Sequence, residues 1–572
     1  MPSRPSAPVT VVACTLLLHA CSCGTPGVGP LETGDTGGVD GPDLTDHVFD
    51  PDHLLRVSIE LDPGDWDALR SQDRDAWEML GREDCLSEPW GSPFDYFPAT
   101  VSIDGEIFPN VGVRKKGFLG SLSEDKPALK VDLSEYGETA EFWGVDRLTL
   151  NNAISDPSFL RQCLGYGFYR DAGLPASRCN YATVVVNDEY LGVFVNVEPI
   201  KKPLLRRHFG NDEGNLYEGT LSDFREGWTG TFEKKTNEDE ADYSDIQALT
   251  AALELPDDQL LAALEPLVDL DAFYTHWAAE VISSHTDGYA YNTNNYYLYA
   301  DPDDGGRLHF IPWGIDAILY GESGQGMPAS VFAYGWLAHR LFELEQSRAA
   351  YRQRLRELLE GPWDEDVFTQ RLDRDRALVL AETPASQVDF VDQNIEALRA
   401  RMDLRRDEID AALAADERWE WPMRESWCFD LIGELEASFA TDYNSIYHQD
   451  AFTYGAADLS FTLNGEAFVP LQIGTVAGES HGSAVLYVAA WISSTEAVIA
   501  YFSTPEDGFE PGAIELGLAD SIGALYYIET QTMEDFELLS YIIGTVELDQ
   551  AGATTGDPVV GRMSGELMSW GW

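Results

Sequence analysis

Two acidic residues and an amide follow one another in a part of the chain where their types could support phosphoryl transfer. Asp287 precedes Asn292 by five residues, and Asp316 lies beyond two strand-like runs around the turn DPDDGG. In the protein-kinase arrangement, one Asp accepts the proton of the attacking hydroxyl, an Asn five positions later holds a metal ion, and an Asp beyond a hairpin holds metal on the nucleotide phosphates. The HRD and DFG motifs are absent, so the correspondence is one of order and chemistry.

Each acid also has a structural interpretation. Asp287 follows a helix-like run and is of a type that often ends helices or forms turns. Asp316 precedes the run AILYG, where it could serve as a helix N-cap. Both acids nevertheless lie at the ends of predicted elements, where a rigid scaffold commonly positions catalytic groups.

A second group of residues supplies positive charge in an otherwise acidic chain. The chain has eight lysines, and four of them follow closely after Arg114. A basic turn between strands, followed by a strand lysine, is typical of a nucleotide-covering lobe. We therefore expect Arg114, Lys116, Lys126 and Lys130 to bind phosphate. The alternative is a basic hairpin tip that lies in solvent.

The elements that must position these groups have clear boundaries. FPATVSIDGEIFPNVGVRKKG predicts a hairpin turning at Asp104 and Gly105, and SDPSFLRQCLGYGFYRDAG predicts a helix with Ser155 or Asp156 as its cap. A second hairpin, ATVVVNDEYLGVFVNVE, is predicted to turn at Asn187 and Asp188 and ends at Glu198. Glu198 is a candidate partner for a phosphate-binding lysine, or else an exposed residue at a strand end.

The C-terminal half changes character along its length. DAFYTHWAAEVISSH predicts a helix leading to Asp287, and residues 335–415 predict further helices by their apolar spacing of three and four. A proline at residue 422 ends this pattern. Beyond residue 425, short strands recur between Gly and Asp turns, which is typical of a β-sandwich.

Composition limits the functional classes. A chain of 572 residues favours two or more domains, and 44% hydrophobic content favours folded cores. The formal net charge of −62 repels phosphate backbones and anionic lipid headgroups, which argues against nucleic acid and the membrane surface as partners. Acidity spread in this way is also expected of a protein from a saline habitat.

The N-terminus has the features of an export signal. Arg4 precedes a short apolar run, and LHAC ending at Cys21 resembles the bacterial lipobox. We predict a lipoprotein signal at residues 1–21 with lipidation at Cys21, or alternatively an ordinary cleaved signal peptide. Residues 22–46, rich in Gly, Pro, Thr and Asp, predict a flexible linker. In an oxidising compartment, Cys163 and Cys179 are candidates for a disulfide, although sequence does not reveal pairing.

Several motifs in order resemble the CotH family, the spore-coat protein H kinases and their relatives. They are VFDPDHLLRVSIELDPGDWDAL, VGVRKKGFLGS with KPALKVDL, DPSFLRQCLGYGFYRDAGLPASRCNYATVVVNDEYLGVFVNVEPI, and FIPWGID. The resemblance covers about residues 47–415. It implies an α+β, two-lobed atypical protein-kinase-like domain, followed here by an all-β sandwich-like domain at residues 425–572. It also implies Mg-ATP as phosphate donor and Ser or Thr side chains of secreted or coat proteins as acceptors.

The resemblance also implies roles for single residues. Lys130 is similar to the nucleotide contact, Asp287 to the catalytic aspartate, and Asn292 or Asn295 to the family's asparagine. Family members often carry an acid directly after the PW pair, whereas this chain has Gly314 there and keeps only Asp316. Asp316 must then hold the metal with the asparagine, or catalysis is weak or lost.

Two functional hypotheses follow. In the first, the protein is an exported kinase, anchored in the cell envelope only through its N-terminal lipid, that phosphorylates secreted or surface proteins. In the second, the kinase-like body is catalytically silent and acts as a surface binding or adhesion lipoprotein. Residue chemistry favours the first, and the scarcity of ATP outside the cytoplasm favours the second. The sequence gives no prediction of oligomeric state.

Overall fold

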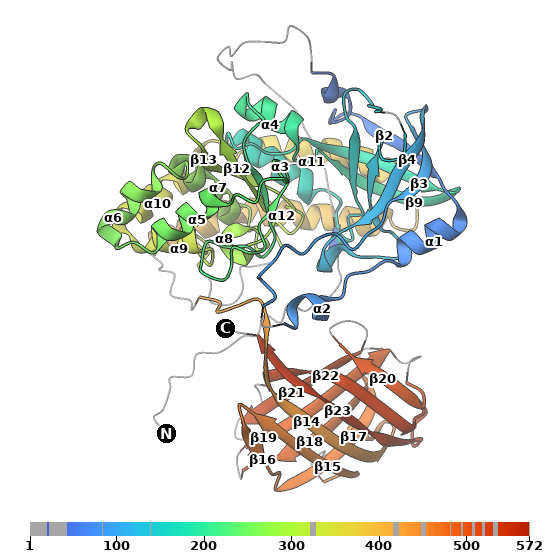
Figure 1. Cartoon of the computed structure of the whole chain (residues 1–572). Coiled ribbons are helices and arrows are strands. Elements are labelled where there is room, and N and C mark those ends of the chain that lie inside the picture. Colours follow the sequence, from blue (N-terminus) through green and yellow to red (C-terminus); the bar gives the residue numbers. More distant parts are fainter. Residues whose placement is uncertain are drawn as a thin grey trace. The chain divides into compact units, whose positions relative to one another are not determined.

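The computed structural model describes residues 20–21, 43–82, 84–137, 139–320, 328–415, 423–447, 453–480, 482–493, 496–505, 509–517, 521–529 and 536–570. Within these limits the chain forms two compact units. The larger comprises Leu17–Arg74 and Leu86–Trp421, and the smaller comprises Asp75–Cys85 and Pro422–Trp572. The mixed α+β class is confirmed, with a large β region at the C-terminus (Figure 1). The predicted signal peptide and most of the predicted linker lie outside the described residues, as does the side chain of Cys21.

Seven strands of the larger unit close into a barrel in the order β2-β3-β4-β5-β6-β9-β8. All neighbours are antiparallel except β2 and β8, which are parallel. The strands are β2 (Leu54–Glu60), β3 (Phe97–Ile103), β4 (Glu106–Lys116), β5 (Ala128–Asp132), β6 (Arg147–Asn151), β8 (Cys179–Val186) and β9 (Glu189–Val197). Alternate side chains such as Val57, Val101 and Leu129 fill the interior, and helix α1 (Pro63–Ser71) packs against it through Trp66 and Leu69.

Both predicted hairpins have the predicted turns. Asp104 and Gly105 have φ of 50° and 88°, and Asn187 and Asp188 have φ of 47° and 67°. A left-handed conformation at both central residues matches the twist of the flanking strands, and Asn, Asp and Gly tolerate it best. These turns therefore set the registers of β3 with β4 and of β8 with β9.

The helix predicted between β6 and β8 begins later than expected. Residues Ser155–Pro157 form the short strand β7, which pairs in parallel with β1 (Ala20–Cys21), and α3 spans Arg161–Asp171. Asp156 is not the N-cap of α3; that position is Leu160. Its carboxylate accepts the N–H groups of Ser158 and Arg161, at 3.1 and 3.0 Å, and so organises a turn before the helix. The candidate disulfide between Cys163 and Cys179 is present and joins α3 to β8.

A four-stranded antiparallel sheet and nine helices form the rest of the larger unit among the described residues. The sheet order is β11-β10-β12-β13, with β10 (Leu216–Gly219), β11 (Glu233–Lys234), β12 (Tyr296–Asp301) and β13 (Arg307–Pro312). The helices are α4 (Lys202–Phe209), α5 (Ser244–Leu253), α6 (Asp257–Leu264), α7 (Leu270–Ile282), α8 (Tyr289–Asn292), α9 (Trp336–Glu343), α10 (Glu345–Glu360), α11 (Glu365–Glu382) and α12 (Val388–Ala414). No helix in the described part of the chain is both long and apolar enough to span a membrane.

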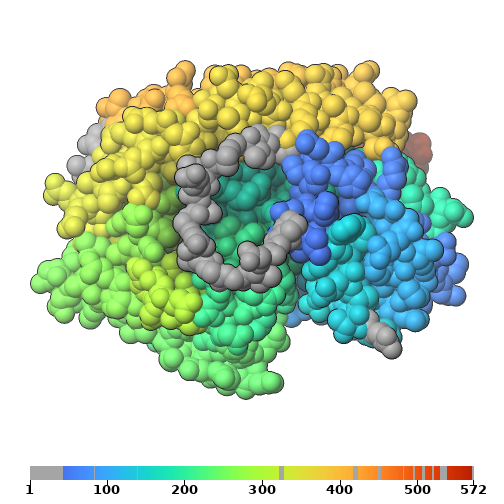
Figure 2. Space-filling model, turned by 90° about the horizontal axis from the view of Figure 1, so that it is seen from above, coloured from blue at the N-terminus to red at the C-terminus, as the bar shows by residue number. Residues whose placement is uncertain are grey.

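The helical part and the barrel share one unit and adjoin one another. In Figure 2 the barrel strands, in blue and cyan, border the C-terminal helices, in yellow and orange. Glu382 at the end of α11 accepts a hydrogen bond from Arg56 at 3.0 Å, and its carbonyl accepts one from Tyr190 at 2.7 Å. Residues from α3, α7, α10, α11 and α12 form the large core of this part, in which Trp277 and Tyr351 stack with ring centroids 3.8 Å apart.

The smaller unit is one continuous antiparallel sheet of ten strands, not the predicted pair of sheets. The strand order is β16-β15-β14-β23-β22-β21-β19-β18-β17, with β20 paired to β22. The strands are β14 (Phe429–Asp442), β15 (Ala456–Leu463), β16 (Glu466–Phe468), β17 (Gln472–Ser480), β18 (Ser483–Trp491), β19 (Glu496–Pro505), β20 (Gly512–Leu516), β21 (Ile522–Glu529), β22 (Phe536–Gln550) and β23 (Pro558–Trp570). Bulges in the long strands bend the sheet, so that β14 and β15 pack against β17 and one sheet encloses its own core.

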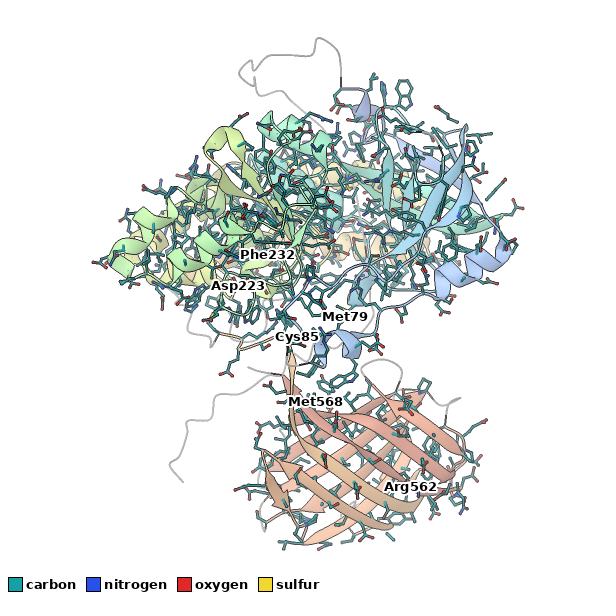
Figure 3. The ribbon with its side chains drawn as sticks, in the orientation of Figure 1. Met79, Cys85, Asp223, Phe232, Arg562 and Met568 are labelled. Atoms are coloured by element: carbon teal, nitrogen blue, oxygen red, sulfur yellow. A yellow bond between two sulfur atoms is a disulfide. The ribbon has the colours of Figure 1, made fainter. Side chains whose placement is uncertain are left out.

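A segment from early in the chain belongs to this smaller unit. Helix α2 (Ala76–Leu80) contributes Trp77, whose ring packs 5.7 Å from that of Phe429. A disulfide between Cys85 and Cys428 (Cys85 is labelled in Figure 3) joins the two sequence segments of the unit. The sequence did not suggest this pair, because 343 positions separate the two cysteines.

Candidate active site

Asp287 lies in the loop between α7 and α8, where three asparagines hold its carboxylate. Asn292 and Asn294 donate to Oδ1 at 3.0 and 3.2 Å, and Asn295 donates to Oδ2 at 2.5 Å. Asn295 also donates to the Asp287 carbonyl at 3.0 Å. Three donors hold one carboxylate in a single orientation. The predicted residues Asp287, Asn292 and Asn295 therefore lie together. The sequence interpretation missed Asn294, although it belongs to the same NTNN run.

The loop around Asp287 is built by other residues. Ser283 is the C-cap of α7 and Gly288 the N-cap of α8, so Asp287 does not end either helix. Glu280 of α7 accepts the N–H groups of residues 289 and 290, both at 2.8 Å. The helix-stop interpretation of Asp287 is therefore wrong, whereas the turn interpretation is right: Asp287 lies in a turn with its side chain half-buried.

Asp223, a fully buried acid that is labelled in Figure 3, contacts both α8 and α9. Its carboxylate accepts the Tyr289 hydroxyl at 3.2 Å and the Trp336 N–H at 2.9 Å, and it pairs with Arg225 at 2.8 Å. Burial raises the pKa of Asp223 in spite of the Arg225 charge and these hydrogen bonds. Asp223 has a structural role, because it fixes the short helix α8. This helix ends at Asn292, the first of the asparagines that hold Asp287.

Asp316 lies half-buried after β13 and is electrostatically coupled to Asp287. Burial raises the pKa of Asp316 to about 6, the Asp287 charge acts in the same direction, and Lys116 opposes it. Residues 317–320 are not helical, so Asp316 is not the N-cap of a helix over these residues. Two acids that share a site in this way are typical of metal-binding or acid-base chemistry.

Arg161 holds the segment that follows Asp316. Its guanidinium donates to the carbonyls of Ile318 and Leu319, at 2.6 and 2.7 Å, and lies 4.1 Å from the ring centroid of Tyr320. Its Nε also pairs with the buried Asp156 at 3.1 Å. Arg161 is therefore an interior anchor of the loop that carries Asp316.

Three predicted cations lie on one face of β4 and β5. Arg114 of β4 is directly opposite Lys130 of β5. Lys116 is two residues further along β4, so its side chain lies on the same face. Lys116 donates to the Asn151 side chain of β6, whose amide in turn donates to Gln162 of α3 at 2.8 Å. The structure thus places Lys116 within electrostatic reach of Asp316.

The charge states of these lysines are unusual. Burial lowers the pKa of Lys130 to about 7, and the neighbouring Arg114 charge acts in the same direction. Burial lowers the pKa of Lys116 to about 8, against the opposing effect of Asp316. A bound anion would stabilise both ammonium groups. The interpretation of this segment as a solvated hairpin tip is wrong for these two lysines.

Lys126 has a different environment from the one predicted. Its ammonium donates to the Val193 carbonyl at 2.7 Å and lies 4.6 and 4.8 Å from the ring centroids of Phe159 and Phe194. Charge, carbonyl and aromatic rings together bind this ammonium within the protein. Lys126 therefore contributes to the packing of the barrel strands, and we remove it from the phosphate-binding set.

Glu198 does not contact the phosphate-binding lysines either. Its buried carboxylate pairs with Arg178 at 2.7 Å and with Arg207 at 2.5 Å. Although burial alone would raise it, these two arginines hold the pKa of Glu198 below its usual value. The acid that interacts with Lys130 is instead Glu218 of β10. The sequence contained no signal for Glu218, because the strand that carries it is only four residues long.

The structure explains why this chain has Gly314 where family members often carry an acid. Gly314 has a left-handed φ of 51°, and a Cβ at this position would lie 2.1 Å from Asn295 Oδ1. Asn295 itself is held by its two hydrogen bonds to Asp287. An acidic side chain at position 314 is therefore incompatible with this position of Asn295. The amide oxygen of Asn295 lies close to where a side chain at 314 would begin.

In another acidic cluster among the described residues, an arginine already occupies the place of a cation. Asp269, Asp304 and His309 have ligand atoms close to one another. The guanidinium of Arg307 lies 2.6 Å from Asp304 and 3.6 Å from Asp269, and His309 lies 2.9 Å from Asp304. The arginine already supplies the positive charge, so Asp287 and Asp316 remain the better candidates for a metal site.

The larger unit is thus a mixed α+β body that holds paired acids, asparagines and lysines. Residues 113–396 match the model of a family described as CotH kinase protein. The chain is also 25% identical, over 261 residues, to the inner spore coat protein H of Bacillus subtilis (strain 168); the match covers 43% of this chain and 70% of that protein. Residues 113–396 therefore form a domain of the CotH family.

Proposed function

We propose that this protein is an exported, lipid-anchored kinase whose CotH domain transfers phosphate from Mg-ATP to Ser or Thr side chains of secreted or surface proteins. The observation that carries the proposal is the convergence of Asp287, Asp316 and Lys116, with Lys130 next to Lys116 on the same face. These residues come from three separate parts of the chain. The family match at residues 113–396 supports a kinase-like fold, in which the barrel and the helical part would act as the two lobes.

The residues present fit a magnesium nucleotide. Carboxylate and amide oxygens are the ligands that Mg²⁺ prefers, and Asp316 with the oxygens of Asn292 and Asn295 would supply them. The raised pKa of Asp316 reflects burial next to a second acid, a situation that a divalent cation would relieve. Lys130, Lys116 and Arg114 would bind phosphate oxygens. When bound, Mg²⁺ would neutralise charge on the transferred phosphoryl group.

Asp287 would act as the general base of the reaction. Two asparagines donate to Oδ1 and one donates to Oδ2, so Oδ2 can accept one further hydrogen bond. A Ser or Thr hydroxyl could donate there, and Asp287 would take its proton as the oxygen attacks the γ-phosphorus of ATP, the bond to the bridging oxygen breaks and ADP leaves. The asparagines would hold the carboxylate so that little reorganisation accompanies this proton transfer.

Two other observations support export and a lipid tether. The relative in Bacillus subtilis is named as an inner spore coat protein, which favours a protein that acts outside the cytoplasm. The lipobox-like LHAC sequence supports a lipid tether at Cys21. Labelling of cells with a radioactive fatty acid checks the tether: wild-type protein should incorporate the label, and Cys21→Ser should not.

Phosphotransfer tests the proposal directly. The tether-free protein would be incubated with labelled ATP, Mg²⁺ and a Ser-rich acceptor. Asp287→Asn and Asp316→Asn preserve side-chain shape and remove one charge each. We expect each change to lower incorporation by about a hundredfold or more, because general base and metal ligand are both required. Asp303→Asn, on the hairpin between β12 and β13, is the matched control and should retain wild-type incorporation.

The alternative function has its own signature. If wild-type protein and both variants show no incorporation, and none binds nucleotide, the domain is a catalytically silent binding module on a lipid tether. Gly314 in place of the acid found in many relatives is the observation that favours this alternative. Equal incorporation by all proteins would also reject the assigned residues.

A further inference from the structure

Glu218 occupies a defined position on the central sheet of the helical part. On β10 it lies opposite Tyr297 of β12 and Glu233 of β11. Its carboxylate accepts the Lys235 ammonium at 2.6 Å and a hydrogen bond from the Tyr297 hydroxyl. Although burial alone would raise it, Lys235 and Tyr297 hold the pKa of Glu218 below its usual value. Glu218 is thus an ionised side chain fixed on a strand between two neighbours.

Half of the lysines of the chain interact with this carboxylate. All eight lysines lie between residues 115 and 235, in a chain with a net charge of −62. Four of them interact electrostatically with Glu218: Lys116, Lys130, Lys201 and Lys235. We call these four residues the lysine cluster. They come from β4, β5, the turn before α4 and the residue after β11, so only the tertiary structure brings them together.

The lysine cluster and Arg114 bring five cations close to four acids. Arg114 adds a fifth cation beside Lys130. Besides Glu218, the acids are Glu233, which pairs with Lys235 at 2.7 Å, Glu238, which interacts with Lys201, and Asp316, which interacts with Lys116. Like charges at this density repel one another and lose protons, unless a carboxylate or a bound anion stabilises them. Glu218 is the carboxylate that the four ammonium groups have in common.

We propose that Glu218 is the positioning residue for the lysines that bind phosphate, the role that the sequence had suggested for Glu198. The inference rests on the proposed function of the same site. Glu198 is already paired with two arginines, whereas Glu218 pairs with Lys235 at 2.6 Å beside its own sheet and interacts with Lys130 of the barrel. Lys201 and Lys235 then extend the phosphate site beyond the two barrel lysines, so that it suits a ligand with several phosphates.

Two variants separate this role from general loss of charge. Glu218→Gln keeps the size of the side chain and its ability to accept hydrogen bonds. Glu233→Gln is the matched control. Glu233 lies on β11, next to Glu218, and contacts Lys235, but it is not an interaction partner of Lys130. Thermal unfolding of both variants would show that each is folded.

The first measurement follows the lysines themselves. Reductive methylation with ¹³C-formaldehyde gives each of the eight lysines one NMR signal, assigned through Lys→Arg variants. In the protein without nucleotide, Glu218→Gln should lower the titration midpoints of both Lys130 and Lys235. Glu233→Gln should move only the Lys235 signal. An unchanged Lys130 titration in Glu218→Gln would overturn the inference, whatever the activity of the protein.

The second measurement uses ATP with Mg²⁺ as the probe. Because Glu218 repels phosphate while it orients lysines, Glu218→Gln should change the Kd for ATP by less than about threefold while kcat falls by about tenfold or more. Glu218→Asp should recover part of kcat. A kcat within about twofold of wild type in Glu218→Gln would reject the positioning role. If ATP moves no lysine signal in the wild-type protein, the proposed function fails. The lysine titrations without nucleotide then still show whether Glu218 interacts with Lys130.

Discussion

Lys130 and Lys116 should make nucleotide binding depend on pH. Their pKa values are lowered by burial to about 7 and about 8, so both lose protons as pH rises through the range from 7 to 8. Only the protonated ammonium attracts phosphate. We therefore expect the Kd for ATP to increase about tenfold between pH 6.5 and 9, as measured by calorimetry. In Lys130→Arg the guanidinium stays charged, and the increase should be smaller. Identical profiles for the two proteins would contradict the assignment of Lys130.

Gly314 should tolerate substitution poorly. In Gly314→Ala the new Cβ would combine a left-handed φ of 51° with an approach of 2.1 Å to Asn295 Oδ1. We expect a loss of about 2–3 kcal/mol in the free energy of unfolding and reduced activity, because Asn295 must move away from Asp287.

The matched control for this prediction is Gly305→Ala. Gly305 also has a left-handed φ, of 70°, but its Cβ would meet nothing within 4 Å. It should therefore lose only about 1 kcal/mol and retain activity. Urea unfolding of both variants measures the difference. Equal losses would show that the contact with Asn295 contributes nothing.

At the scale of elements, the pair formed by Asp156 and Arg161 joins β7 and α3 to the loop after β13. Arg161 carries the two carbonyl contacts to residues 318 and 319, and Asp156 is fully buried. In Arg161→Met the buried Asp156 would lose its partner. We expect a loss of about 3–5 kcal/mol in the free energy of unfolding, together with lower phosphotransfer because the Asp316 loop is released.

Two further variants make this prediction specific. Arg161→Met with Asp156→Asn removes the unpaired charge and should be more stable than Arg161→Met alone. Arg56→Met breaks an exposed pair with Glu382 and should change stability by less than about 1 kcal/mol. Chemical unfolding of the three proteins provides the comparison. A loss in Arg161→Met no larger than in Arg56→Met would show that Arg161 is not an anchor.

At the scale of the whole molecule, the net charge of −62 should make stability depend strongly on salt. Like charges repel in the folded state, and the Debye length falls from about 30 Å at 0.01 M to about 3 Å at 1 M salt. We expect the Tm to rise by about 5 °C between these salt concentrations, as followed by circular dichroism. An equal osmolality of glycerol is the control for solvent effects. A Tm that is constant or falls with NaCl would contradict a dominant role of repulsion.

The sequence by itself determined the features that depend on neighbours in the chain. The turns at residues 104–105 and 187–188 follow from residues that tolerate left-handed φ, and the helices α9 to α12 follow from apolar spacing. Asp287 and its asparagines lie within nine positions of one another, so a short loop is enough to bring them together. The CotH family was also recognisable, because its motifs keep their order along the chain.

Only the tertiary structure decided which distant groups meet. Glu218 and not Glu198 interacts electrostatically with Lys130, Lys126 binds a carbonyl within the barrel, and Arg161 anchors the loop after Asp316. The C-terminal strands were predictable, but their union in one sheet was not. The physical reason is the same in each case: local patterns set strands, turns and helices, whereas the packing of these elements determines which side chains from remote segments share a site.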